Sequence, residues 1–243
     1  MALERKKRKN NGVSFRKVKA IFTKEIKDSL RNNRIVFLFL LFPAFAYLVT
    51  FLLGDNLDTD PITFVEMHIS MIPLMITASL IAEEKDKNTL KVLMLSNVKP
   101  VEFLLGVLSF VFLLNVVTTC FFIPLMSFKI AEFIRFLLVI SVGIICSTIL
   151  GAIIGITARA GSNVAATSTP VTLLFALVPL LAQMMPGSAI AGFASILYSG
   201  QMISILMDLT GNFTFIRFGI MLLNFLVFMV IFLIIYGNKN LAE

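Results

Sequence analysis

The chain has 243 residues, of which 58% are hydrophobic, and its formal net charge is +7 at pH 7. It contains 24 Phe and 12 Met but no Trp. Several apolar runs reach the ~20 residues that a helix needs to cross a bilayer. This pattern excludes a soluble globular domain and predicts an all-α, polytopic membrane protein.

The first 34 residues form a basic segment. They hold 12 of the 21 Lys and Arg residues and three acidic residues. A nucleic-acid-binding arm is one interpretation, but a basic segment just before a membrane helix is more simply a cytoplasmic anchor. We therefore expect membrane lipid, and no nucleic acid, as its partner.

A helix is predicted inside this segment, from Ser14 as a candidate N-cap to about Asn32. Apolar residues follow one stripe of this helix and basic residues follow the other face. An amphipathic helix of this kind lies in the headgroup plane; the alternative is a soluble helix packed on another protein. The stripe consists of Phe15, Val18, Phe22, Ile26 and Leu30, and the basic face of Arg16, Lys17, Lys24, Lys27 and Arg31.

Six spans are predicted across residues 35–236, followed by a short tail at 237–243. The acidic loop at 54–61 is assigned to the outside and the basic N-terminus to the inside, because cytoplasmic segments carry the excess of Lys and Arg. Six spans then place both termini in the cytoplasm of a cell-membrane protein. The spans are Ile35–Leu53, Ile62–Ala82, Val101–Met126, Phe133–Ala158, Pro170 to about Met185, and Phe213–Tyr236.

Residues 83–99 form a short charged connection between the second and third spans, and their four lysines agree with the cytoplasmic side. Leu90, Leu93 and Met94 are spaced as one apolar face of a helix of one or two turns. Because so short a helix is unstable alone in water, we expect its apolar face to bind a partner protein at the membrane surface.

Two further connections are predicted. Residues 159–169 read as a turn rich in Gly, Ser, Asn and Thr. Residues 186–212 are broken by five Gly and Pro residues and contain no Lys and one Asp, so they are expected to form an external re-entrant or interfacial helical hairpin. Broken backbone near a membrane must be covered by protein or face water.

Few residues have side chains that could catalyse a reaction or bind a metal. The sequence has no P-loop, zinc signature or nucleophile elbow, so we predict neither an enzyme nor a metal site. The thiols of Cys120 and Cys146 are expected to be small core groups, and His68 a polar packing residue. The charges of Glu66, Arg135 and Arg217 are expected near the external ends of their spans; they could pair there, but simple helix-end charges are the favoured interpretation.

No carboxylate is expected deep inside a span, where a proton-driven carrier usually has one. This argues that the driving energy comes from outside the chain.

Three stretches resemble the permease subunits of type-2 ABC exporters. Lys24–Pro43 looks like the elbow helix and first span of that family, and Val101–Gly106 like the opening of its third span. Ile81–Val98 is similar to its most specific stretch, although Asn88 stands where glycine is usual and Asn97 where proline is usual. The matching residues there are Glu84, Lys85, Asp86, Thr89, Leu90, Leu93 and Ser96.

The resemblance implies the rest of a transport machine. Two permeases, identical or paralogous, would form the pathway, and two separate P-loop ATPase subunits would bind ATP and Mg. Residues 83–99 would be the coupling helix on which the ATPases dock, with Met94 among its contacts, and residues 186–212 would be an external gate.

The expected function is export of a hydrophobic or amphipathic substrate, such as an antimicrobial peptide or a drug. Two alternatives remain open at this point: a stand-alone carrier or channel driven by a gradient, and a non-transporting immunity or scaffold protein of the membrane.

Overall fold

The computed structural model describes residues 13–53, 60–87, 98–126, 128–158, 163–211 and 214–238. Every regular element in these ranges is a helix, as the sequence predicts. In chain order they are α1 (Phe15–Leu30), α2 (Asn33–Leu53), α3 (Pro61–Asp86), α5 (Pro100–Thr119), the 3₁₀ helix η2 (Cys120–Leu125), α6 (Ile130–Thr157), α7 (Val164–Met184), α8 (Ala189–Ala194), α9 (Tyr198–Leu206) and α10 (Phe215–Asn238).

Six helical stretches in the described part of the chain are long and apolar enough to cross a membrane. They are α2, α3, α5 continued by η2, α6, α7 and α10, which confirms the predicted number of candidate spans. The protein is therefore a multi-pass membrane protein by the length and composition of its helices.

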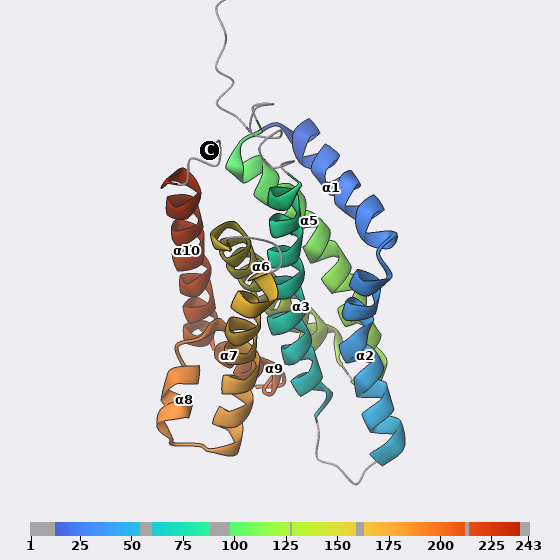
Figure 1. Ribbon diagram of the computed structural model, residues 1–243. Helices are drawn as coiled ribbons and strands as arrows, with labels where there is room; N and C mark the ends of the chain where they lie inside the picture. Colours follow the sequence, from blue (N-terminus) through green and yellow to red (C-terminus); the bar gives the residue numbers. More distant parts are fainter. Residues whose placement is uncertain are drawn as a thin grey trace, which may run out of the picture.

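The long helices stand side by side in a bundle with α3 at its centre (Figure 1). In the most apolar window of α3, 72% of the residues are buried, against 17% in α10. Helix α3 packs most extensively on α6 and also contacts α2, α5, α7 and α9. The backbones of α3 and α6 come close because Gly151 and Gly155 lie at the contact, where an added Cβ would overlap the carbonyl groups of Leu74 and Ala78.

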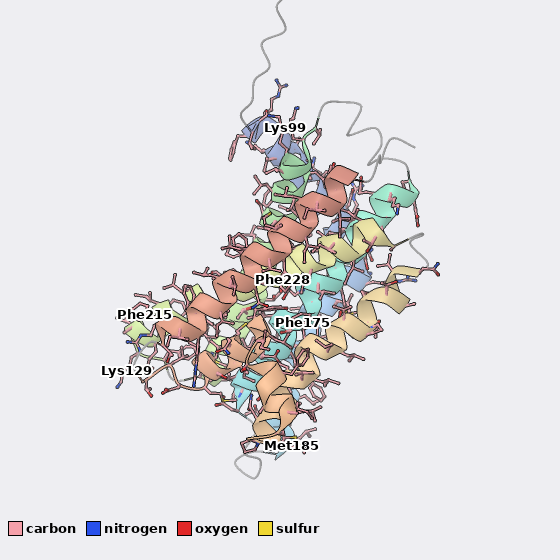
Figure 2. All side chains as sticks on the ribbon, turned by 90° about the vertical axis from the view of Figure 1, so that its left-hand side faces the viewer. Lys99, Lys129, Phe175, Met185, Phe215 and Phe228 are labelled. Carbon is pink, nitrogen blue, oxygen red and sulfur yellow. The ribbon has the colours of Figure 1, made fainter. Side chains whose placement is uncertain are left out.

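The bundle has two distinct ends. Figure 2 shows Lys99 at one end and Lys129, Met185 and Phe215 at the opposite end, and we call these the Lys99 end and the Met185 end. The connection from α3 to α5 is thus at the opposite end from the connection of η2 to α6 and from the α8–α9 region. The loops therefore alternate between the two ends of the bundle in the order that the predicted spans require.

The bounds of several helices differ from the prediction. Helix α7 begins at Val164, so residues 164–169, expected in a turn, are helical, and Pro170 lies inside the helix. Small and β-branched residues favour a turn in water, but a segment in a membrane bundle must satisfy its backbone groups internally. Helix α3 continues to Asp86, so its last turn includes the first four residues of the predicted coupling segment.

Helix α6 begins at Ile130, three residues before the predicted start of the fourth span. The cause is a capping box: the backbone N–H of Lys129 donates to the Glu132 carboxylate over 2.9 Å. The third span ends as a 3₁₀ helix that contains Pro124, which lacks a backbone N–H and so cannot continue an α-helix without losing a bond.

Candidate functional site at the junction of α1, α3 and α5

Helix α1 lies side by side with the first turns of α5 (Figure 1). The contact is close because Gly106 has no side chain, and an added Cβ would stand 2.6 Å from Cγ2 of Ile21. The residues of α1 that are nearly fully buried are Ile21, Glu25 and Ser29. This buried face adjoins the predicted apolar stripe, in which Phe22 and Ile26 pack against the core and the first residue, Phe15, is 80% exposed.

The other residues predicted on α1 have mixed surroundings. Val18, Phe22 and Ile26 are half-buried, Arg31 is exposed, and the side chain of Leu30 lies outside the described residues. The hydroxyl of Ser14 makes no cap hydrogen bond. Its backbone N–H instead donates to a carboxylate of α5.

That carboxylate belongs to Glu102, which is buried in the first turn of α5. Oε1 accepts the backbone N–H of Ser14 at 2.7 Å, and Oε2 accepts that of Lys99 at 2.8 Å and lies 3.4 Å from the ammonium of Lys17. A carboxylate at a helix N-terminus is also stabilised by the helix dipole. Glu102 therefore joins the start of α1 to the start of α5, a role that its position three residues after the N-cap could have indicated.

A second buried carboxylate, Glu84, lies in the last turn of α3. The ammonium of Lys24 on α1 pairs with Glu84 Oε1, and it also lies 3.5 Å from Glu25 Oε1 and 3.9 Å from Asp28 Oδ2. Burial raises the pKa of Glu25 to about 7, while the charge of Lys24 opposes this shift and that of Glu84 adds to it. Three carboxylates here share one ammonium group.

Lys85 joins α3 to the end of α6. Its ammonium donates to the backbone carbonyls of Ile156 (3.3 Å) and Ala158 (2.5 Å). A lysine at a helix C-terminus satisfies carbonyls that have no partner in the helix and complements the dipole. The neighbouring Asp86 is exposed at the end of α3.

The remaining predicted coupling residues, Asn88, Thr89, Leu90, Leu93, Met94 and Ser96, lie outside the described residues. The described chain leaves α3 at Lys87 and returns at Val98. Both sides of this connection are attached to α1. On the α3 side, Glu84 pairs with Lys24 of α1. On the α5 side, Glu102 contacts Ser14 and Lys17 at the start of α1. Helix α1 thus bridges the two ends of the connection.

The charges predicted at external helix ends have separate partners. Nη1 of Arg135 donates to the carbonyls of Leu209 (3.0 Å) and Gly211 (2.7 Å), and Nη1 of Arg217 donates to that of Ser204 (3.0 Å). Both arginines line one small cavity at the C-terminal end of α9. The structure does not bring Glu66 to either of them.

Glu66 is fully buried, and the hydroxyl of Ser70 donates to its Oε1 at 2.7 Å. Glu66 therefore lies near the start of α3, as predicted, but the helices around α3 bury it, so its side chain is not exposed at the helix end. His68 is likewise buried, with Nε2 2.9 Å from Thr118 Oγ1 and its ring against Phe42 and Phe122. This agrees with the packing role expected for it.

The region 186–212 contains two short helices with opposite surroundings. Helix α8 is largely exposed, whereas α9 is buried from its first residue, Tyr198. The Tyr198 hydroxyl lies 2.7 Å from Ser147 Oγ, which donates to the carbonyl of Ile69 at 2.7 Å. The Tyr198 ring stacks on Phe175 and meets the edge of Phe228, two rings that Figure 2 shows in the middle of the bundle.

Tyr198 and Ser147 were not predicted from the sequence, since a single Tyr in a glycine-broken stretch gives no local signal of burial.

The two thiols differ in exposure: Cys146 is in the core, as expected, but Cys120 is exposed on η2. Within the described ranges, no three His, Cys, Asp or Glu side chains are grouped so that they could hold a metal ion.

No protein-family model matches the chain, and no curated protein sequence matches it. The fold defines the class as a multi-pass α-helical membrane protein.

Proposed function

We propose that the chain is the membrane-spanning permease subunit of an ATP-driven exporter of the type-2 ABC kind, in which separate subunits hydrolyse ATP. The observation that carries the proposal is the attachment of both sides of the 83–99 connection to α1 by buried carboxylates, Glu84 and Glu102. A force applied to this connection would reach α1, α3 and α5 together, because these helices cannot move apart without breaking a contact of a buried carboxylate.

The central helix α3 supports the same mechanism, since it extends from the connection to the contact with α9. Its last turn holds Glu84, and the carbonyl of Ile69 accepts the hydroxyl of Ser147, which also bonds Tyr198 at the start of α9. Movement of α3 at the Lys99 end would therefore be transmitted to the α8–α9 region, which acts in this proposal as the external gate.

The exposed faces of α7 and α10 support a partner beside α7. The exposed residues of α10 whose side chains are described are all apolar, as expected where a helix faces lipid. Those of α7 include Thr167, Thr169 and Gln183 towards the two ends of the helix, with leucines exposed in its middle. Polar side chains on the outer face of a span usually face protein or a water-filled path. We assign this face to the second permease and the pathway between the two copies. The content of Phe and Met suits a hydrophobic or amphipathic substrate.

The test uses the substitution Leu93→Arg in the tagged full-length chain. Purification of the wild-type chain from membranes is expected to recover a P-loop ATPase, and the reconstituted complex is expected to transport substrate only with Mg·ATP. Leu93→Arg should remain inserted but lose the ATPase and transport. The matched control is Ile130→Arg, an exposed apolar residue at the Met185 end, which should retain both. An unchanged yield of ATPase with Leu93→Arg would contradict the coupling role.

One observation favours a second candidate, a gradient-driven carrier. Glu66 is a fully buried carboxyl group bonded to Ser70, and buried carboxyl groups in membrane helices commonly move protons. Proteoliposomes that contain the chain alone distinguish the two candidates. Transport driven by a proton gradient without nucleotide, and lost in Glu66→Gln, would establish the carrier. Binding of a peptide without dependence on ATP would indicate an immunity protein instead.

A further inference from the structure

A row of basic side chains follows the outer face of α1. Arg16, Lys19 and Lys27 are exposed and, with Ala20 and Thr23 between them, repeat at intervals of three or four residues, so they lie along one line of the helix. Together these five residues line a shallow groove of about 540 Å³, to which Lys24 and Asp28 also contribute. We call the three bases the α1 basic row.

The α1 basic row has no ionic partner in the described part of the chain. Lys24 and Lys17, on the flanks of α1, are paired with Glu84 and Glu102. The helical repeat of 100° per residue places the row directly opposite Ile21 and Glu25, which face the rest of the protein. The fold thus uses two lysines for internal pairs and directs the other bases away from the bundle.

An exposed apolar flank borders the row. Phe15 is 80% exposed, and Phe22 and Ile26 on the same side are only half-buried. A helix with one face on protein, one apolar flank and one basic row suits the boundary between headgroups and acyl chains. A helix that binds nucleic acid in water would leave this apolar flank exposed to solvent, which is unfavourable.

The start of α2 fixes the depth of the row. Helix α2 has 21 residues, about 31 Å at 1.5 Å per residue, which matches the ~30 Å hydrocarbon core of a bilayer. Only Arg31 and Asn32 separate α1 from α2, so α1 ends where the hydrocarbon begins. At this level the surrounding groups with negative charge are lipid phosphates.

We propose that the α1 basic row is a binding site for the phosphate groups of anionic phospholipids. The site holds α1 at the membrane surface from its outer side, while Glu84 and Glu102 hold it from the inner side. Bound lipid therefore stabilises the junction of α1, α3 and α5. This inference requires only that the chain spans a membrane and does not depend on the exporter proposal.

The test measures binding of fluorescent phosphatidylglycerol to the purified full-length chain in phosphatidylcholine nanodiscs. The variant is Lys19→Gln/Lys27→Gln. Each base near a charged membrane surface contributes about 1 kcal/mol, so removal of two should weaken binding about 30-fold. The control, Lys87→Gln/Lys129→Gln, removes the same charge from two positions away from the row and should leave binding within about twofold. Both variants should melt like the wild type in phosphatidylcholine alone.

Three results would overturn the proposal. Equal loss of binding in the two variants would reduce the effect to net charge. Displacement of the labelled lipid by millimolar inorganic phosphate would show a site for free anions. Tighter binding of a single-stranded oligonucleotide than of phosphatidylglycerol, lost in the Lys19→Gln/Lys27→Gln variant, would assign the row to nucleic acid.

Discussion

The junction of α1 at the Lys99 end and the end of α9 at the Met185 end satisfy their charged side chains in different ways. At the Lys99 end, the buried carboxylates Glu84 and Glu102 receive lysine ammonium groups and backbone N–H groups from a neighbouring helix. At the Met185 end, Arg135 and Arg217 donate to backbone carbonyls around the end of α9. The first arrangement depends on the protonation state of carboxyl groups, whereas arginine and backbone carbonyl groups do not change their protonation state at any ordinary pH.

The packing differs as well. An added Cβ at Gly106 would meet Cβ and Cγ2 of Ile21, at 2.7 and 2.6 Å, so α1 would have to shift away from α5. One at Gly200 would overlap the backbone carbonyl oxygen of Ala194 still more closely. The contact between α8 and α9 is therefore tighter than that between α1 and α5.

The largest effect is expected from matched substitutions of these two glycines. Gly200→Val should destabilise the protein by about 4 kcal/mol or prevent folding, because backbone must move to admit the side chain. Gly106→Val should cost about 2 kcal/mol, because the contact is less tight and α1 can shift away from α5 to admit the side chain. Denaturant titration of both variants in detergent measures the difference. Equal destabilisation would contradict the contrast between the two ends.

The sequence predicts the architecture because hydropathy is a local property. Each apolar run that is long enough for a bilayer became a helix of the bundle, and the glycine-broken region became two short helices. The early start of α7 at Val164 was missed because the Ser and Thr residues of 164–169 are weak helix formers in water, where the competing turn is solvated.

The contacts that define the candidate site were not predictable in this way. Glu84 pairs with a lysine 60 residues away, and Ser14 with Glu102 over 88 residues. Glu66 resembles any helix-end charge in the sequence, and only the helices packed around α3 make it buried. These contacts depend on which helices are neighbours, and a single sequence does not specify that for a bundle of similar apolar helices.

A smaller effect is expected from pH at the Lys99 end. Glu25 has a pKa of about 7 in the folded protein, above its ordinary value of 4.5, because it is buried. The folded state therefore binds this proton more tightly than the unfolded state, so the contribution of Glu25 to stability is most favourable below about pH 4.5 and is lost as the pH rises towards 7. The full shift corresponds to about 3 kcal/mol at most. Glu25→Gln should abolish this loss and be more stable than the wild type at pH 8.

Unfolding of both proteins between pH 4 and 9 tests this expectation. Parallel pH profiles would show that the pKa of Glu25 is the same in the folded and unfolded states. The contrast between the two ends would then lose its basis in protonation, although the difference in packing would remain.

The smallest effect is expected at the Met185 end. Arg135→Met keeps an unbranched apolar stem but leaves the carbonyls of Leu209 and Gly211 without their donor, which should cost about 1–2 kcal/mol. The control is Arg16→Met, an exposed residue on the outer face of α1, which should change stability by less than about 0.5 kcal/mol in neutral detergent. Unfolding at pH 5 and pH 8 gives the decisive comparison: a carbonyl contact has no proton to lose, so the cost of Arg135→Met should be the same at both. A cost that changes with pH would mean that a carboxyl group, with Asp208 in the same cavity as the first candidate, acts at this end as well.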